Sequence, residues 1–298
     1  MRNRILINLV LFIIVALTAG FLFLTDQDTG EKPVERLTTI DPATIEDIRI
    51  IRRDLDDLVF RKLQQGWFML SPYDYYANPQ RIQTLLNLLQ SVSLTQLDAS
   101  PGELPRFLLD DPRVSVVFNN QVQVDFGDSS PLGSQRYVKL DDKIHLINEG
   151  LFQQLLTSAT FFLSPRLIPG NQKINSIIFP DHTLQLQGDN WQVIPEMTIS
   201  TDKLNDLVNA WNNARALTIS EYTGQDAGEK IIIGLEPDKQ IEFVIINDTS
   251  NLILARPDLA LQFHLNEFDT ERMWLDQILH PENNEEPGEI MDNPRKDP

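Results

Sequence analysis

The chain has 298 residues and carries 43 acidic against 25 basic side chains, a formal net charge of −18 at pH 7. A body this acidic is repelled by nucleic acid and by anionic headgroups, so neither is an expected ligand. The chain has no cysteine, which excludes zinc–thiolate, iron–sulfur and cysteine-nucleophile chemistry.

The N-terminus contains a long uncharged run, Ile5–Leu24. A helix of about 20 apolar residues is long enough to cross a bilayer. Arg2 and Arg4 precede the run and acidic residues follow it, which predicts a cytoplasmic N-terminus. The alternative is a cleaved signal peptide, but its apolar core is shorter and ends in a small-x-small site that is missing here. We therefore expect an uncleaved signal anchor over residues 1–25, followed by a short polar tether over 26–39.

Residues 40–165 are predicted to form a first unit of strands around one capped helix. Short apolar runs bounded by turn residues predict an antiparallel meander, and Asn78-Pro79 begins a helix with apolar residues from Ile82 to Val92. Asn119-Asn120 is typical of a tight hairpin turn, because Asn tolerates positive φ. The expected strands are Ile45–Ile51, Leu58–Leu63, Trp67–Leu70, Val114–Phe118, Val122–Phe126, Tyr137–Leu140 and Lys143–Ile147, with a short helix over Leu151–Leu156.

The same order of elements recurs in residues 166–279, which indicates an internal duplication. Ser200-Thr201 begins the second long helix, and Trp191 and His264 answer Trp67 and His145 of the first unit. The predicted strands are Ile174–Phe179, Leu184–Leu186, Trp191–Ile194, Ile231–Leu235, Ile241–Ile246, Leu252–Ala255 and Leu261–Leu265, followed by a helix over Glu271–Ile278. The predicted fold class is α+β, an N-terminal transmembrane helix followed by tandem units of antiparallel sheet plus helix. Residues 280–298 are acidic and proline-rich and are predicted to be disordered.

Several of these segments together resemble the domain-of-unknown-function family numbered 4340. The resemblance is carried by the N-terminal run, by GW before a capped helix, and by FLLDDPRVSVVF, VDFG, RYVKL, VNAWNNARAL and LILAR. It covers about residues 40–275, and its motifs are structural. It implies an envelope-facing component of ABC-type export systems, including those linked to gliding motility, encoded near an ATPase and a permease. It implies an accessory or structural role and not a known enzyme activity.

The side chains that could carry chemistry do not form a recognisable catalytic or metal motif. His145, His182, His264 and His280 have no metal-ligand spacing, and a hydrogen-bonded or surface role is the simpler interpretation; His182 and His280 look solvated. Three acidic pairs lie at predicted turns, where Asp bonds nearby backbone amides; they are Asp56-Asp57, Asp110-Asp111 and Asp141-Asp142. We predict no catalytic residue, no metal site and no cofactor.

Trp67 and Trp191 are the candidate ligand-stacking residues. Aromatic rings can stack on sugars, but a repeated position on a strand after a turn favours core packing. Exposure of either ring in a cleft between the two units would favour ligand binding.

Three functions follow as hypotheses. The first is a non-enzymatic scaffold or accessory subunit of an ABC-type export complex, held in the inner membrane through residues 5–24 with its body in the periplasm. The second is a periplasmic module that binds an envelope glycan or another small ligand in the cleft between the units. The third, a hydrolase, is the weakest because no recognisable nucleophile or metal set occurs.

Overall fold

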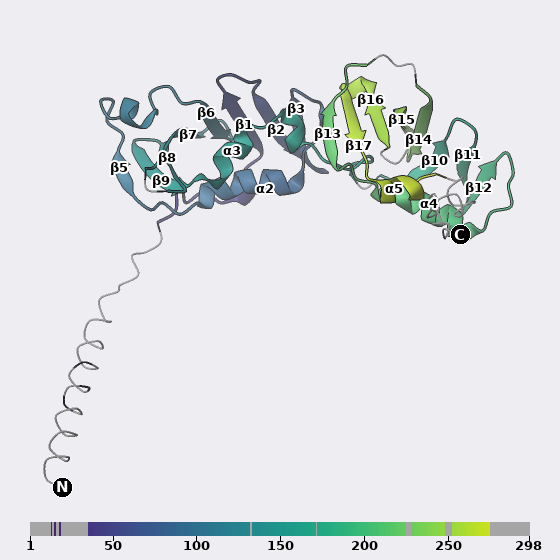
Figure 1. The fold of residues 1–298 in the computed structure, drawn as a ribbon, viewed down its shortest axis with the longest axis horizontal. Coiled ribbons are helices and arrows are strands. Elements are labelled where there is room, and N and C mark those ends of the chain that lie inside the picture. The colour runs from purple at the N-terminus through teal and green to yellow at the C-terminus, as the bar shows by residue number, and fades with distance from the viewer. Residues whose placement is uncertain are drawn as a thin grey trace, which may run out of the picture.

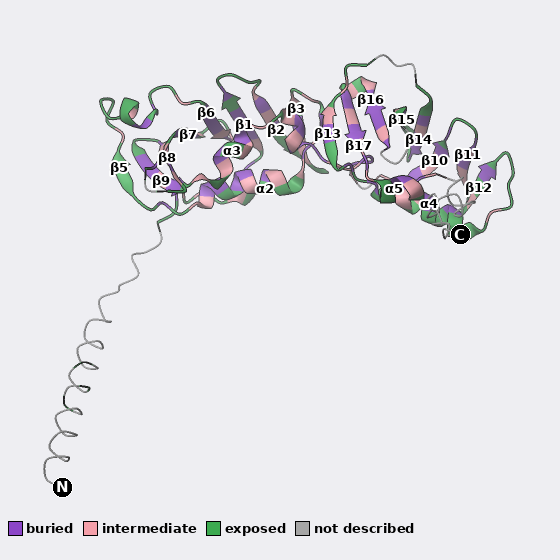
Figure 2. Cartoon of the chain, in the orientation of Figure 1, coloured by how far each residue is buried: buried purple, intermediate pink, exposed green. Residues whose placement is uncertain are grey.

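In the computed structural model, two large antiparallel sheets stand side by side with short helices packed against them (Figure 1). The described residues are 35–131, 133–170, 172–224, 228–247 and 252–274, together with Ile13, Val15 and Thr18. Apolar residues alternate along many of the strands, so one face of each sheet is buried, as period-2 patterns dictate. Figure 2 shows these buried positions recurring along the strands of both sheets.

The first sheet has nine strands in the order β4-β3-β2-β1-β6-β7-β8-β9-β5. The hairpin between β6 and β7 turns at Asn119 and Asn120, whose φ angles of 49° and 53° confirm the predicted tight turn. The strands are β1 (Asp47–Arg52), β2 (Leu58–Leu63), β3 (Gly66–Ser71), β4 (Tyr75–Tyr76), β5 (Gln96–Asp98), β6 (Val114–Phe118), β7 (Val122–Ser129), β8 (Gln135–Leu140) and β9 (Lys143–Asn148).

The second sheet has eight strands in the order β12-β11-β10-β14-β15-β16-β17-β13. Position by position, this is the order of the first sheet without β4. The strands are β10 (Ile174–Ile178), β11 (Thr183–Gln187), β12 (Asn190–Ile194), β13 (Thr218–Glu221), β14 (Lys230–Leu235), β15 (Lys239–Asn247), β16 (Ile253–Arg256) and β17 (Leu261–His264).

Each sheet carries one longer and one shorter α-helix. The Asn78 side chain caps α2 (Pro79–Asn87) by accepting from the backbone of Gln80 at 3.0 Å, and Pro79 occupies the first turn as predicted. Ser200 caps α4 (Thr201–Asn213) in the same way. The short helices are α3 (Phe152–Leu155) and α5 (Glu267–Arg272), and the 3₁₀ turns are Pro42–Thr44, Leu88–Gln90, Leu104–Phe107, Glu149–Leu151, Ala159–Phe162 and Pro257–Leu259.

The predicted fold class is wrong. Instead of α+β units after a transmembrane helix, the described chain is mostly two large antiparallel sheets. The helical periodicity produces only short helices, nine residues in α2 and thirteen in α4, because Leu88 already begins a 3₁₀ turn and a strand-forming stretch follows each helix. No described helix is both long and apolar enough to cross a membrane. The predicted anchor, Ile5–Leu24, lies outside the described residues apart from Ile13, Val15 and Thr18, and the predicted tail lies wholly outside them.

The two sheets are joined head to tail. The β4 side of the first sheet meets the β13 side of the second, where the Tyr73 hydroxyl donates to Glu221 at 2.8 Å. The rings of Tyr75 and Phe263 also meet there, with their centroids 5.9 Å apart. One hydrophobic cluster runs through both sheets. The outer edges, β5 and β12, therefore lie at opposite ends of the body (Figure 1).

Candidate binding cleft between the two sheets

The segment 162–168 links the two sheets through backbone hydrogen bonds on both of its sides. Toward the first sheet, Ser164 N–H donates to the Tyr76 carbonyl at 2.8 Å. Toward the second, Ala216 N–H donates to the Pro165 carbonyl at 2.8 Å, and Leu167 N–H donates to the Ala214 carbonyl at 3.2 Å. Backbone pairing of this kind holds the groups around it in a defined geometry.

Three hollows surround this junction. The first, of about 240 Å³, is the candidate binding cleft: it is lined by Gln65, Gly66, Trp67, Tyr76, Ala77, Pro79, Gln80, Ser164, Pro165, Arg166, Pro169, Gly170 and Arg215. A second of about 310 Å³ shares Pro165 with it and reaches β13. A third of about 580 Å³ shares Gln65 and Gly170 and is wide and open, so it encloses a ligand less well than the binding cleft. The candidate site thus combines side chains from both halves of the chain.

The two candidate tryptophans have different surroundings. Trp67, on β3, is half-buried and lines the binding cleft beside Tyr76. Trp191, on β12, is also half-buried, but it lies on the outer edge strand at the far end of the second sheet. Equivalent strand positions are separated because the two sheets are joined head to tail. The structure therefore does not bring the two rings to one site.

The cleft also holds two arginines that sequence reasoning missed. An isolated antiparallel bridge places Arg166 opposite Arg215, and the buried Tyr75 hydroxyl donates to the Arg166 carbonyl at 2.8 Å. The Arg166 Nε is buried with no hydrogen-bond partner. Among the described residues, neither guanidinium forms an ion pair. No short motif signals this pair, because the bridge joins segments far apart in the chain.

The histidines in equivalent positions are hydrogen-bonded to serines. His145 Nδ1 lies 2.9 Å from the Ser93 hydroxyl, and His264 Nε2 lies 2.9 Å from the Ser220 hydroxyl. Burial lowers the pKa of His145, which favours the neutral form of the ring. Within the described residues, no group of three or more His, Asp or Glu side chains could hold a metal ion.

The prediction that His182 is solvated is wrong. Its ring is buried and stacks on Phe179 with centroids 4.5 Å apart, while Nδ1 lies 2.7 Å from the Asp181 carboxylate. The sequence analysis missed this contact because Phe179 directly follows β10, three residues before His182, and their stacking depends on how the turn folds back. His280 lies outside the described residues.

The predicted acidic turns bind nearby backbone or arginine groups. Asp57 accepts from the Arg52 backbone at 3.3 Å and forms an ion pair with Arg49 at 2.6 Å. Asp111 forms an ion pair with Arg53 at 2.8 Å. Asp141 has a φ of 50° in the turn between β8 and β9. Asp57 thus bonds a nearby backbone amide as predicted, whereas Asp111 pairs with an arginine and Asp141 lies in the predicted turn.

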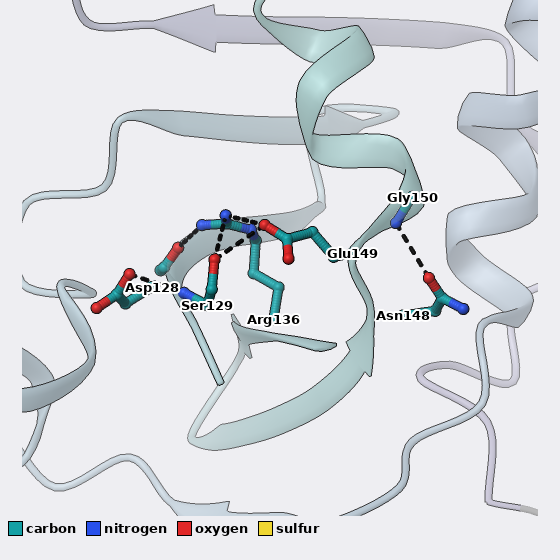
Figure 3. Close-up of polar contacts among 7 residues, drawn as sticks. Asp128, Ser129, Arg136, Asn148, Glu149 and Gly150 are labelled. Atoms are coloured by element: carbon teal, nitrogen blue, oxygen red, sulfur yellow. Dashed lines mark hydrogen bonds and ion pairs between the residues drawn. The ribbon is translucent and has the colours of Figure 1, made fainter. Parts of the chain in front are cut away.

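A second polar cluster, shown in Figure 3, is centred on Arg136 of β8. The buried Arg136 guanidinium lies 3.6 Å from the Phe152 ring centroid and donates to Ser129 at 2.8 Å, to Glu149 and to the Gly127 carbonyl. The hydrogen bond from Arg136 is the main cause that lowers the pKa of Glu149. Three hydrogen bonds from the Arg136 guanidinium reach β7 and the turn before α3, so this cluster ties these segments together. The Arg136 Nε is buried without a hydrogen-bond partner.

A comparison with family models matches residues 67–231 to the family described as Domain of unknown function (DUF4340). The matched stretch covers more than half of the chain and contains Trp67, Tyr76, Arg166 and Arg215. Comparisons with curated proteins and with solved structures found no match. The chain belongs to the DUF4340 family, a domain of unknown function.

Proposed function

We propose that this protein is a non-enzymatic accessory or scaffold subunit of an ABC-type export complex. The observation that carries the proposal is a body of two joined sheets with a sheet edge at each of its opposite ends, β5 and β12. An edge strand offers backbone N–H and C=O groups to which a partner can add a strand. A body with one such edge at each end suits a bridge between two partners.

Both edges carry exposed apolar side chains beside these backbone groups. At the β5 end, Leu94 is 52% exposed and Leu97 is 43% exposed. At the β12 end, Ile194 is 53% exposed. Apolar side chains on an edge strand favour association, whereas charged ones protect against it. The export association itself rests on the family resemblance.

A location at the periplasmic side of the inner membrane belongs to the same proposal. Its support is in the sequence, where arginines precede the uncharged N-terminal run and acidic residues follow it. Cell fractionation with protease protection tests it: the body should be degraded only once the outer membrane is opened. Degradation that requires opening of the inner membrane would contradict this location.

The scaffold proposal is tested by cross-linking in mildly solubilised membranes, followed by purification and mass spectrometry. We expect an ABC ATPase and a permease to co-purify. Leu97→Lys or Ile194→Lys should weaken recovery because a charge on the edge opposes strand addition. Leu55→Lys is the matched control, since Leu55 is also exposed but lies in the turn between β1 and β2. Recovery of the protein without either subunit would refute the proposal.

A second function, a module that binds an envelope glycan or another small ligand, is favoured by the binding cleft. The half-buried Trp67 ring lies in a cleft to which both halves of the chain contribute. An apolar ring surface beside amides and hydroxyls is the composition that sugar and small-molecule sites use. The amides are Gln65 and Gln80, and the hydroxyls are Tyr76 and Ser164.

Intrinsic tryptophan fluorescence of the full-length chain, titrated with defined envelope saccharides, tests this second function. A saccharide that binds in the cleft should change the emission, and Trp67→Ala should abolish both the change and the binding. Trp191→Ala is the control, because Trp191 has the equivalent strand position but lies at the far end of the body. Equal loss of binding in both variants would refute the cleft as the site.

A further inference from the structure

We propose that the binding cleft is a site for a small organic anion, in which Arg166 and Arg215 hold a carboxylate or phosphate group and Trp67 stacks against the attached ring. This inference rests on the proposed binding function and adds the charge and the size of its ligand. Three independent features of the cleft support it.

The first feature is the placement of two cations directly opposite each other. The isolated bridge pairs Arg166 with Arg215, and both side chains line the same cleft. Residues opposite each other on paired strands have neighbouring Cβ atoms, and like charges in such positions repel. An anion bound between the two guanidinium groups converts this repulsion into attraction.

The second feature is the unsatisfied guanidinium of Arg166. Its Nε is buried and makes no hydrogen bond, although buried polar groups nearly always have a partner. The Arg166 backbone is held by the Tyr75 hydroxyl and by the bridge to Arg215, which places the base of this side chain beside the cleft. Guanidinium groups bind carboxylate and phosphate oxygens through paired N–H donors. A ligand oxygen would satisfy the Nε group.

The third feature is the lack of a carboxylate in the lining of the cleft. Acidic residues outnumber basic ones 43 to 25 in the chain, and six other described arginines pair with Asp or Glu: Arg49, Arg53, Arg61, Arg106, Arg136 and Arg256. Among the described residues, the lining of the cleft has no Asp or Glu. The Arg166 and Arg215 side chains therefore have no acidic partner in the cleft, although the chain has more acidic than basic residues.

The dimensions and the net charge define the class of ligand. The cleft volume of about 240 Å³ falls below the ~300–1,000 Å³ of sites for drug-sized molecules, so the ligand has the size of a single sugar ring. The net charge of −18 repels polyanions such as nucleic acid. A monosaccharide-sized acid, either a sugar carboxylate or a sugar phosphate, meets both conditions and can stack on Trp67.

Titration of the full-length chain with glucuronate, glucose 6-phosphate and glucose tests the proposal by calorimetry. At least one anionic sugar should bind ten times more tightly than glucose, and the preferred one separates carboxylate from phosphate recognition. Arg166→Gln and Arg215→Gln should each weaken that binding at least tenfold. Arg113→Gln is the matched control, because Arg113 is exposed, lies outside the cleft and forms no ion pair among the described residues.

A second measurement guards against variants that fail to fold. Inorganic phosphate should raise the melting temperature of the unmodified chain above that in chloride of equal ionic strength. The increase should be smaller in Arg215→Gln, in which only the general stabilising effect of phosphate remains; the Arg215 side chain is exposed, so the fold does not depend on its burial. Glucose bound as tightly as the anionic sugars would refute the anion site while leaving the binding function in place. No binding of any sugar, together with an equal phosphate effect in the unmodified chain and in Arg215→Gln, would refute both.

Discussion

Tyr75→Phe removes one hydroxyl from the contact between the two sheets and should lower the stability of both. The side chain is 4% exposed, its hydroxyl donates to the Arg166 carbonyl at 2.8 Å, and its ring meets Phe263 of the second sheet. The phenylalanine variant keeps the ring contact and loses only the hydrogen bond. A buried hydrogen bond contributes about 1 kcal/mol net, and the stranded carbonyl can raise the loss to about 2 kcal/mol.

The expected change in melting temperature follows from the size of the body. For a domain of this length, 1 kcal/mol corresponds to about 2–4 °C, so Tyr75→Phe should melt several degrees lower. Tyr75→Ala also creates a cavity at the junction and should cost about 3–5 kcal/mol. Because one hydrophobic cluster runs through both sheets, we expect each variant to unfold in a single transition at its lower temperature.

Differential scanning calorimetry of the full-length chain measures these shifts. Tyr137→Phe is the control, since its ring also packs against a phenylalanine, with centroids 4.5 Å apart, but its hydroxyl has no hydrogen-bond partner among the described residues. That variant should change stability by less than about 0.5 kcal/mol. Equal effects of the two substitutions would refute the hydrogen-bond argument. A second transition that keeps its original temperature in Tyr75→Ala would show that the sheets unfold independently.

The same hydroxyl predicts a loss of stability in alkali. Burial raises the pKa of Tyr75 above its usual 10.0, so the unfolded chain loses this proton at a lower pH than the folded chain does. The contribution of the protonated Tyr75 hydroxyl to the free energy of unfolding is therefore fully present below pH 10, and it is lost as the pH rises above that value. Tyr75→Phe should flatten this part of the pH profile. An unchanged alkaline slope would contradict the assignment to Tyr75.

Two further predictions concern a close backbone approach and a buried histidine. Gly127→Ala places a Cβ 2.3 Å from the Phe107 carbonyl oxygen and should lower the free energy of unfolding in urea by about 2–3 kcal/mol. Gly102→Ala is the control, because its Cβ meets open space. Equal urea midpoints of the two variants would contradict the clash. Burial lowers the pKa of His145 below 6.5, so the unfolded chain takes up a proton first as the pH falls. The stability that the neutral ring contributes above pH 6.5 should therefore be lost as the pH falls below that value. Between about pH 8 and pH 5, the melting temperature should fall less in His145→Gln than in the unmodified chain.

Local sequence signals located most of the strands. Strand β2 has the bounds predicted for Leu58–Leu63, and Asn119-Asn120 adopts the predicted positive φ angles. These features depend on alternation and on intrinsic residue preference, which can be read from a few neighbouring residues. Their recognition required no knowledge of tertiary contacts.

Three of the four strands at the sheet ends, β4, β5 and β13, were missed for a physical reason, whereas β12 was predicted. β4 has two residues, β5 has three and β13 has four, and all the residues of β5 are exposed. Such short strands show no period, and they form only because a neighbouring strand pairs with them. The same omission contributed to the wrong α+β prediction. With three strands missing, the two longer helices made up too large a share of the predicted elements.

The candidate site depends on contacts between distant segments. Trp67 and Trp191 occupy equivalent positions in the sequence pattern, but only Trp67 lines the cleft. The reason is that β4, next to the Trp67 strand β3, meets β13 at the junction. Arg166 and Arg215 come together through a single isolated bridge. Such a bridge has no local sequence pattern, so tertiary structure was needed to identify the anion site.

The head-to-tail joining of the sheets gives the molecule a direction. A body built around a two-fold axis would present the same edge at both ends, whereas this one ends in β5 on one side and β12 on the other. Contact between unlike ends is head-to-tail, and it builds either a closed ring or an open filament. The net charge of −18 on every copy opposes such growth, so self-association through the two unlike ends is disfavoured.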